Sequence, residues 1–407
     1  MKQYIQIAWR NLWRNKRRTL ITVASVFFAI FLSLLMRSMQ IGSYDMMEHD
    51  AVKNSTGYLQ IHAKGYWDDK TINNTFENNP SLTRKVKNTS NITTLTPRLE
   101  SFALASSGNM TKGVAVIGTD PEIENKMTGL TKRVIRGNYF SNDSAEILLG
   151  VTLAKFLKVD VGDTLVLLSQ GFHGITAAGK FLVQGILEFP AKNMNSEIAY
   201  LKLKDAQYFY AAPGRLTSLS LMIENPDELE TTKETLQHKL GEDYEVMTWK
   251  QMMVALVQSI ESDNISGLFM LGILYLVVAF GIFGTMLMMT MERKKEFAVM
   301  VSVGMQRYKI SYILIFETLF IGFMGIVLGI LISFPLIYYF HLNPIPLTGA
   351  AAQAMIDFNA RPILPFSTDL FIFTNQAIVV IILTFLAIMY PIYYVSKFNI
   401  LKAFHGR

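Results

Sequence analysis

The stretch "MERKKEFAVMVSVGMQRYKI", residues 291–310, decides the fold class because it lies between two long apolar runs. Its first half is charged, and its second half mixes apolar and basic residues. A polar segment this short, placed between two runs of membrane-crossing length, predicts a loop at a membrane surface. The fold then depends on how many such runs the chain contains and on which side of the membrane this segment lies.

The composition fits a chain that is partly embedded in a membrane and partly exposed to water. Of the 407 residues, 51% are hydrophobic and 17% are charged. This is too apolar for an ordinary soluble enzyme and too charged for a bundle that lies wholly in lipid. Because the chain has no Cys, disulfides, zinc–cysteine sites and thiol nucleophiles are excluded.

Four apolar runs reach the roughly 20 residues needed to cross about 30 Å of hydrocarbon. They predict transmembrane helices over residues 19–41, 264–291, 310–340 and 370–396. The remaining segments are predicted as an amphipathic cytoplasmic helix over 1–18, an extracytoplasmic domain over 42–263, a short helix over 292–309, an outer loop over 341–369 and a cytoplasmic tail over 397–407.

The two helices that flank the outer domain are predicted to extend beyond the bilayer. The segment 249–264 leads into the second span with no Gly or Pro before Gly267, which favours one stiff helix. The first span has a similar continuation after Arg37, although Gly42 weakens that prediction.

Basic residues near the spans predict the orientation. The N-terminal 18 residues contain no acid and carry Lys2, Arg10, Arg14, Lys16, Arg17 and Arg18. By the positive-inside rule this tail, residues 292–309 and the C-terminal tail are cytoplasmic, so the large domain lies outside. The net charge of +6 is thus mainly a topology signal, and no basic patch with interleaved aromatic residues indicates nucleic-acid binding.

The outer segment predicts an α+β domain. Strand patterns occur at "GYLQIH", "GVAVIGT", "DTLVLLS", "KFLVQGILEF", "EIAYLKL" and "LTSLSLMIE", and helix patterns at "PDELETTKETLQHKL" and "WKQMMVALVQSIESDN". The sequence "GITAAGK", Gly174 to Lys180, has the spacing of a phosphate-binding loop, but Phe181 replaces the Ser or Thr and no helix follows. A hairpin turn is favoured, and no ATPase site is expected in this chain.

No catalytic or metal centre is predicted. The six His residues show no metal-ligand spacing, and no nucleophile elbow or paired acid and base is recognisable. We therefore expect a non-catalytic chain without a cofactor of its own.

Glu317 is the one acid inside an apolar span. A structural pair with a cytoplasmic-side Arg or Lys is favoured over a proton or substrate contact, because an unpaired carboxylate is costly there. Gly322, Gly325 and Gly329 on the same helix form a small-residue seam for close helix packing, either within the chain or between two chains.

Residues 292–304 resemble the FtsX/MacB-type ABC permease family at its pattern E-R-x-x-E-[IF]-x-x-[LM]-[RK]-[AS]-[IV]-G. The matching residues are Glu292, Arg293, Glu296, Phe297, Met300, Ser302, Val303 and Gly304, whereas Val301 departs from it. The resemblance extends through residues 8–22, 136–169, 315–333 and 390–404, and it is greatest for the lipoprotein-releasing, LolC/LolE-like permeases.

This resemblance implies a membrane protein of the type VII ABC transporter, MacB-like class, with four transmembrane α-helices and a large α+β periplasmic core domain between helices 1 and 2. It would lie in the bacterial inner membrane with both termini in the cytoplasm. Two permease chains, identical or paralogous, would pair. Each would move its outer domain when a cytoplasmic LolD-like ABC ATPase, which binds the ATP and Mg, closes.

The resemblance also assigns residues to roles. The ATPase would dock on a coupling helix through Glu292, Arg293, Glu296, Phe297, Met300, Val301 and Gly304. A lipoprotein substrate would place its acyl chains between spans 1 and 2, against Phe27, Phe28, Phe31, Leu35, Leu268, Leu271, Tyr275 and Phe280. A periplasmic lipoprotein chaperone would be a further partner. A MacB-like efflux permease, an FtsX-like regulator of a periplasmic partner and a soluble-ligand sensor are the alternatives.

Overall fold

The computed structural model describes residues 1–141, 145–190, 192–357 and 361–397. It divides into two compact units, which we call the helical unit (Met1–Asp45, Ser259–Pro346 and Ile363–Arg407) and the sheet unit (Met46–Gln258 and Leu347–Pro362). Of the predicted cytoplasmic tail, residues 398–407 lie outside the described residues.

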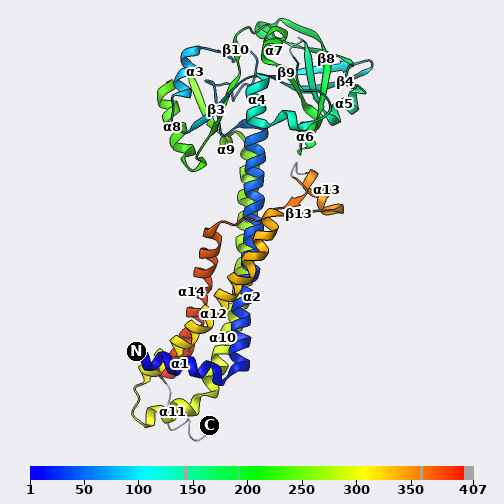
Figure 1. Cartoon of the computed structure of the whole chain (residues 1–407). Coiled ribbons are helices and arrows are strands. Elements are labelled where there is room, and N and C mark those ends of the chain that lie inside the picture. The colour runs from blue at the N-terminus through cyan, green and yellow to red at the C-terminus, as the bar shows by residue number, and fades with distance from the viewer. Residues whose placement is uncertain (142–144, 191, 358–360, 398–407) are drawn as a thin grey trace. The chain divides into compact units, whose positions relative to one another are not determined.

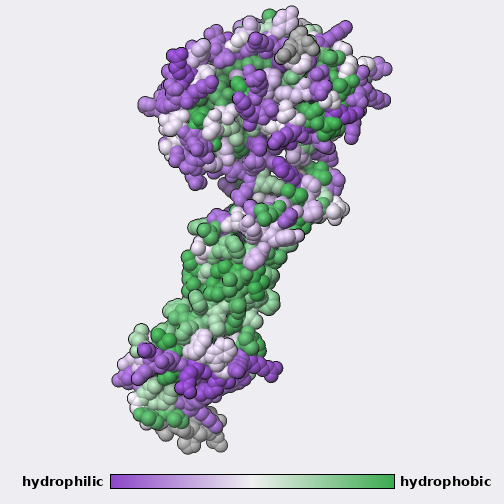
Figure 2. Space-filling model, viewed as in Figure 1, coloured by the Kyte–Doolittle hydropathy of each residue, from purple (hydrophilic) through white to green (hydrophobic). Residues whose placement is uncertain are grey.

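The helical unit is built from four long helices and two short ones (Figure 1). The long helices are α2 (Lys16–Ala51), α10 (Val254–Glu292), α12 (Arg307–Leu342) and α14 (Leu370–Ser396), and the short ones are α1 (Lys2–Arg14) and α11 (Lys294–Ser302). All four long helices are apolar and long enough to cross a membrane. Figure 2 shows a hydrophobic band along them and a hydrophilic band near α1.

The first long helix continues well past residue 41. It runs to Ala51 and ends in a π-helical turn, η1 (Val52–Thr56). Gly42 does not break it. A Cβ at Gly42 would lie 2.7 Å from the carbonyl oxygen of Pro365 and 2.8 Å from the amide nitrogen of Ser367, so this glycine permits close packing of the 365–367 segment. In that segment the Ser367 amide donates a hydrogen bond to the carbonyl oxygen of Ser38, at 2.9 Å.

The second long helix also extends beyond the predicted span. Helix α9 (Trp249–Met252) is followed by a break at Met253, and α10 then runs without interruption from Val254 through Gly267 to Glu292. The sequence predicted one continuous helix from residue 249, whereas in the structure the continuous helix begins at Val254. At the N-terminus, the predicted helix over 1–18 ends at Arg14, and Asn15 with φ −110° and ψ 48° separates it from α2.

The sheet unit contains one ten-stranded mixed sheet in the order β12-β1-β11-β3-β4-β9-β6-β8-β5, with β7 paired to β3 and β8. The strands are β1 (Leu59–Ala63), β3 (Ile92–Ser107), β4 (Met110–Thr119), β5 (Val134–Gly137), β6 (Glu146–Gly150), β7 (Thr164–Gln170), β8 (Thr176–Leu187), β9 (Ile198–Lys202), β11 (Ser218–Ile223) and β12 (Tyr244–Thr248). Small two-stranded sheets join β2 (Phe76–Glu77) to β10 (Arg215–Leu216), and, in the helical unit, β13 (Ile345–Pro346) to β14 (Ile363–Leu364).

Helices cover this sheet in two groups, each over its own apolar core (Figure 1). They are α3 (Pro80–Lys87), α4 (Pro121–Thr128), α5 (Val151–Leu157), α6 (Lys192–Glu197), α7 (Leu203–Phe209) and α8 (Leu229–Leu240). Helix α13 (Gly349–Asp357) lies in the second segment of the unit and contributes to neither core. The 16-residue strand β3 links the two cores, since its first half pairs with β11 and its second half with β4. The predicted fold, four transmembrane helices with a large α+β domain between the first two, is confirmed.

Each predicted strand stretch contains a strand, and the phosphate-loop spacing lies in a hairpin. Strands β7 and β8 pair antiparallel, with Thr164 opposite Leu182 at one end and Gln170 opposite Thr176 at the other. Most of "GITAAGK" therefore lies within β8. The turn is closed by the Gly171 amide, which donates to the carbonyl of Ile175 at 2.6 Å. Gly174 has φ +80°, a left-handed conformation that favours glycine.

The region predicted as a loop, 341–369, contains more structure than expected. It includes the end of α12, the β13–β14 pair and α13. Its central part belongs to the sheet unit, where Arg361 makes a 2.5 Å ion pair with Asp50.

Candidate functional site

Helix α11 is a short amphipathic helix that connects α10 to α12. It ends at Ser302, and Gly304 just beyond it has a φ of +101°, which is unfavourable for other residues. The Gly304 amide donates to the carbonyl of Val301 at 3.0 Å, and the Met305 amide donates to the carbonyl of Met300 at 2.9 Å. These two bonds form a Schellman motif, which stops α11 and lets the chain turn into α12.

One face of α11 is buried against the helical unit itself. Phe297 is only 2% exposed and packs in a cluster with Ile310, Leu314, Ile388 and Val395 of α12 and α14. Met300 and Val301 are partly buried against the same cluster. In this arrangement Phe297 offers little surface to a partner, whereas Met300 and Val301 keep part of theirs, and the docking role of these residues stays a prediction.

The opposite face of α11 and the turn that follows it are exposed and carry two valines among polar residues. Val299 is 50% exposed and Val303 is 84% exposed, beside the exposed Lys295 and Ser302. Val303 matched the family pattern, but neither valine was assigned a docking role from the sequence. The periodicity showed that α11 has an apolar face, but it could not show which part of that face the chain covers itself.

A buried ion pair fixes the start of α11 to α12. The Nη1 atom of Arg293 donates to both carboxylate oxygens of Glu317, each at 2.8 Å. Asn11 of α1 adds a third bond, from Nδ2 to Oε1 at 2.7 Å. Both charged side chains are almost fully buried, so each depends on the other for compensation.

Two further ion pairs connect this site to the N-terminal helices. Arg14 of α1 contacts Glu296 at 2.5 Å, and Arg18 of α2 contacts Glu292. Burial alone would raise the pKa of Glu296, but hydrogen bonds from Arg14 and Arg293 outweigh it, and that pKa lies below its usual value. The three charged residues of the E-R-x-x-E pattern therefore bind the chain's own α1, α2 and α12.

Sequence reasoning treated the basic N-terminus only as a topology signal. A further signal was present, because Arg14 and Arg18 are four residues apart, as are Glu292 and Glu296. On a continuous helix such spacing would put each pair of like charges on one face. In the structure each pair instead spans the junction between two helices, α1 with α2 and α10 with α11. Trp9 of α1 packs edge-on against Phe320 of α12, with ring centroids 5.3 Å apart.

The eight expected substrate-cleft residues do not form one surface. Phe28, Leu268 and Phe280 are exposed, whereas Leu271 is buried. Tyr275 is half-buried, and its hydroxyl donates to the side-chain oxygen of Gln376 on α14.

The remaining three cleft residues, Phe27, Phe31 and Leu35, are half-buried. Phe27 stacks on Phe31 with centroids 5.6 Å apart and meets Phe28 edge-on. Helix α2 thus presents a continuous aromatic row, while the α10 residues divide between the outer surface and the interior.

A polar clamp, missed at the sequence level, joins α2 to α10. Arg37 donates to the side-chain oxygen of Asn264 at 2.7 Å, and the Tyr44 hydroxyl donates to Asp263 at 2.6 Å. Gln40 lies between them and donates to the carbonyl of Asp263 at 3.0 Å. A Cβ on Gly267 would lie within 2.1 Å of the Gln40 amide, so the glycine makes room for the clamp.

The glycine seam of α12 packs within the same chain. A Cβ on Gly325 would lie 2.5 Å from Cβ of Val26, and one on Gly329 would lie 2.6 Å from Ile30. Gly322 instead faces Thr384 of α14 at 3.3 Å. The seam therefore allows α12 to approach both α2 and α14 closely.

In the sheet unit, Arg98 joins the end of the first long helix to the sheet. It lies in β3 and is fully buried, with Nε and Nη2 donating to Glu124 of α4 at 2.9 and 2.6 Å. Its Nη1 also donates to the carbonyl of Ser55 in η1. This charged anchor holds η1, β3 and α4 together.

The segments that follow η1 and precede α9 are neighbours in the sheet. Strands β1 and β12 pair antiparallel, with Leu59 opposite Thr248. The Trp249 amide donates to the carbonyl of Tyr58 at 2.9 Å. The segment that follows α2 and the segment that precedes α10 therefore lie in adjacent strands. Among the described residues, no group of three or more His, Asp or Glu side chains could hold a metal ion.

Two protein-family models match the chain. One, described as the MacB-like periplasmic core domain, matches residues 19–239, more than half of the chain. The other, described as the FtsX-like permease C-terminal, matches residues 268–400.

Curated relatives carry names from the same group. The lipoprotein-releasing system transmembrane protein LolC of Neisseria meningitidis is 22% identical over 268 residues, 64% of each chain. LolE of Haemophilus influenzae is 22% identical over 340 residues, 80% of each chain. The macrolide export ATP-binding/permease protein MacB of Hyphomonas neptunium is 22% identical over 219 residues, 50% of this chain and 33% of that protein.

The matched length is limited for some of these relatives. The chain spans 64% of the Neisseria LolC and 58% of a LolC from Xylella fastidiosa, both under two thirds. Among solved structures, the periplasmic region of MacB from Actinobacillus actinomycetemcomitans is 17% identical, with a TM-score of 0.36, covering 52% of this chain and 95% of that one. Because the two family models match residues 19–239 and 268–400, the chain belongs to the FtsX/MacB family of ABC transporter permeases.

Proposed function

We propose that this permease transmits the motion of a separate, cytoplasmic ABC ATPase to its sheet unit and thereby extracts lipoproteins from the bacterial inner membrane. The ATPase would be of the LolD-like kind and would supply the ATP and Mg site. The two termini and α11 would then lie in the cytoplasm, in accordance with their basic residues.

The observation that carries this proposal is the double attachment of α11. Its inner face is held by the Phe297 cluster and by the Arg293–Glu317 pair, while Val299 and Val303 remain exposed. A helix fixed on one side, with exposed valines on the other, is suited to receive a force from a partner. The ion pairs of Glu292 and Glu296 would pass that force to α2 and α1.

The lipoprotein substrate is supported by the names of the LolC and LolE relatives. A second permease chain, identical or paralogous, would complete the membrane part, and a periplasmic chaperone would accept the lipoprotein. The aromatic row of Phe27, Phe28 and Phe31 on α2 is the part of the expected cleft that fits acyl chains best. Moving an acyl chain out of the bilayer into water costs about 0.8 kcal/mol of free energy per CH₂ group. ATP hydrolysis would supply this free energy.

The docking step is tested by Val303→Asp in the full chain, purified in mild detergent. We expect the variant to insert normally but to lose the co-purifying ATPase, because a charge replaces the most exposed apolar side chain of the α11 surface. Ile135→Asp is the matched control, since Ile135 is 46% exposed in the sheet unit. ATPase retained by Val303→Asp would exclude docking through this surface.

The substrate is tested separately by mass spectrometry of the molecules bound to the purified complex. Acylated lipoproteins, released when ATP is added, are the expected result. The alternatives predict different companions: an outer-membrane duct for a MacB-like efflux permease, and a periplasmic enzyme without cargo for an FtsX-like regulator. Finding either of these without lipoproteins would replace the proposed substrate.

A further inference from the structure

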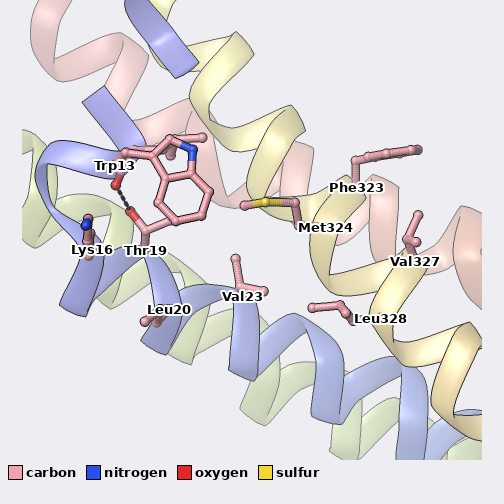
Figure 3. A pocket seen from close by; sticks show the side chains of 10 residues that line it. Trp13, Lys16, Thr19, Leu20, Val23, Phe323, Met324, Val327 and Leu328 are labelled. Carbon is pink, nitrogen blue, oxygen red and sulfur yellow. Dashed lines mark hydrogen bonds between the residues drawn. The ribbon is translucent and has the colours of Figure 1, made fainter. Parts of the chain in front are cut away.

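A cavity of about 340 Å³ lies between the α1–α2 junction and α12, away from the expected substrate cleft (Figure 3). Leu12, Trp13 and Leu20 line it from the junction side, and Phe323, Met324 and Leu328 from α12. Its volume falls in the range of small-ligand sites, roughly 300–1,000 Å³. None of the eight expected cleft residues lines it, so it is a separate site.

The wall is apolar except at one end. Of its two polar residues, Thr19 already uses its hydroxyl, which donates to the carbonyl of Leu12 at 2.9 Å. The other is Lys16, which lies at the junction end, while Val327 and Leu328 lie at the other end (Figure 3). The cavity therefore suits a long apolar group whose head is near Lys16.

The cavity adjoins surface that faces lipid. Leu20 of α2 and Phe323 of α12 are 62% and 66% exposed, and both belong to membrane-crossing helices. Trp13 at the junction end is half exposed, as is typical of an indole at the membrane interface. An acyl chain can thus enter sideways from the bilayer without crossing water.

The charges around the junction are unevenly compensated. Arg14 and Arg18 are paired with Glu296 and Glu292. Lys16 and Arg17 are exposed, and neither has an acidic partner among residues 1–141, 145–190, 192–357 and 361–397. Lys16 lines the cavity, and an uncompensated cation at one end of an apolar slot is complementary to an anionic amphiphile.

We propose that this cavity binds one acyl chain of an anionic phospholipid from the leaflet next to the N-terminus, with its phosphate held by Lys16. The lipid would fill the angle between α1 and α2, where Asn15 interrupts the helix. It would thereby support the geometry in which Arg14 reaches Glu296 and Arg18 reaches Glu292. The site does not depend on the transported substrate, so it stands whether or not lipoproteins are the cargo.

The test is native mass spectrometry of the full chain, with its co-purifying partners, after incubation with phosphatidylglycerol or phosphatidylethanolamine of equal chain length. We expect phosphatidylglycerol to be retained preferentially. Lys16→Gln should weaken its retention about fivefold, the effect of one basic residue at an anionic surface, and leave phosphatidylethanolamine unchanged. Leu328→Trp should abolish retention of both lipids by filling the apolar end.

Matched controls come from the same helices. Leu331→Trp adds the same bulk to α12 at a residue that does not line the cavity, and Lys2→Gln removes an exposed lysine from the opposite end of α1. Both should retain phosphatidylglycerol like the unmodified chain. Equal retention of the two lipids, or undiminished phosphatidylglycerol retention in Lys16→Gln and Leu328→Trp, would mean that the retained lipid is ordinary surrounding lipid. Either result would overturn the proposal.

A second measurement uses phosphatidylglycerol with brominated acyl chains, which quench nearby indoles. Quenching should be strong in the unmodified chain and should fall sharply in Trp13→Phe, because Trp13 lines the cavity. Unchanged quenching in Trp13→Phe would mean that the lipid lies elsewhere. A second protein copy or a detergent molecule occupying the cavity would protect Trp13 from quenching and would likewise contradict the site.

Discussion

Glu317 illustrates at the residue scale why an acid is tolerated inside an apolar helix. An isolated carboxylate in this position would lose its hydration without compensation. Arg293 supplies two hydrogen bonds and the opposite charge, and Asn11 supplies a third bond. Breaking such a buried pair from one side costs about 3–5 kcal/mol, which makes α1, α11 and α12 structurally interdependent.

His62 is a second buried ionisable residue, in β1 of the sheet unit. Its Nδ1 lies 2.9 Å from the carbonyl oxygen of Thr217, and its ring stacks on Tyr66 with centroids 5.0 Å apart. Burial lowers the pKa of His62 to about 4, helped by the nearby Lys70 and opposed by the Thr217 hydrogen bond. The folded protein therefore keeps this imidazole neutral at pH values where the unfolded chain protonates it.

This shift predicts a pH dependence of stability. Between the unfolded pKa of about 6.5 and the folded value of about 4, the unfolded state binds more protons, so stability falls as the pH decreases. The loss attributable to His62 between pH 7 and pH 5 should be about 2 kcal/mol. Thermal unfolding of the full chain, followed over this pH range beside His62→Gln, measures it.

His62→Gln should show a smaller loss of stability on acidification than the unmodified chain. The comparison isolates His62 from Glu100, whose pKa is raised by burial and whose contribution has the opposite sign. Parallel pH profiles of the two proteins would contradict a buried, neutral His62.

At the element scale, the contacts of Gly325 and Gly329 indicate that the packing of α12 against α2 requires residues without a side chain at these positions. The closest approach is at Gly325, where a Cβ would be 2.5 Å from Val26 on α2. Real side-chain atoms do not approach this closely, so α2 and α12 would have to separate. This explains why small residues recur along α12 where it meets its neighbours.

Gly325→Ala should therefore destabilise the helical unit by about 1–3 kcal/mol, as expected for overpacking. Gly272→Ala is the matched control, because Gly272 lies in α10 with no atom within 4 Å of its Cβ position. The control should be neutral or slightly stabilising, since alanine favours helix. Thermal unfolding in detergent distinguishes the two, and equal unfolding temperatures would exclude this packing of α2 against α12.

The helices also show what the sequence can and cannot predict. Hydropathy located the four spans because membrane crossing imposes a length and an apolar composition. It could not predict that α2 continues through Gly42, since a glycine that breaks a helix and one that admits a neighbouring backbone look identical in sequence. Only the contact with Pro365 and Ser367 distinguishes them.

The same limit applies to the candidate site. The amphipathic pattern of residues 294–302 correctly indicates that one face is apolar. It cannot show that Phe297 packs on α12 and α14 while Val303 stays exposed, because that depends on residues nearly 100 positions away. The Arg14–Glu296 and Arg18–Glu292 pairs were missed for the same reason.

At the scale of the whole molecule, the proposed transmission of force would follow a series of ion pairs, helices and strands. Glu296 of α11 pairs with Arg14 of α1, and Glu292, the last residue of α10, pairs with Arg18 of α2. Helix α2 then continues through η1 into β1. Arg98 fixes η1 to β3, and β3 links both cores of the sheet unit. Under the proposed function, a displacement that begins at α11 would reach the sheet unit along these covalent and charged connections.

The most direct test of this account is a charge exchange between Arg18 and Glu292, measured as lipoprotein released per ATP hydrolysed by the reconstituted complex. Arg18 and Glu292 make no other ion pair among the described residues, so exchanging them should restore the contact. The account predicts that Arg18→Glu keeps the ATPase bound and hydrolysing ATP but releases severalfold less lipoprotein. The exchange variant, Arg18→Glu with Glu292→Arg, should then recover the release. Normal release by Arg18→Glu, or no recovery in the exchange variant, would contradict transmission through this ion pair.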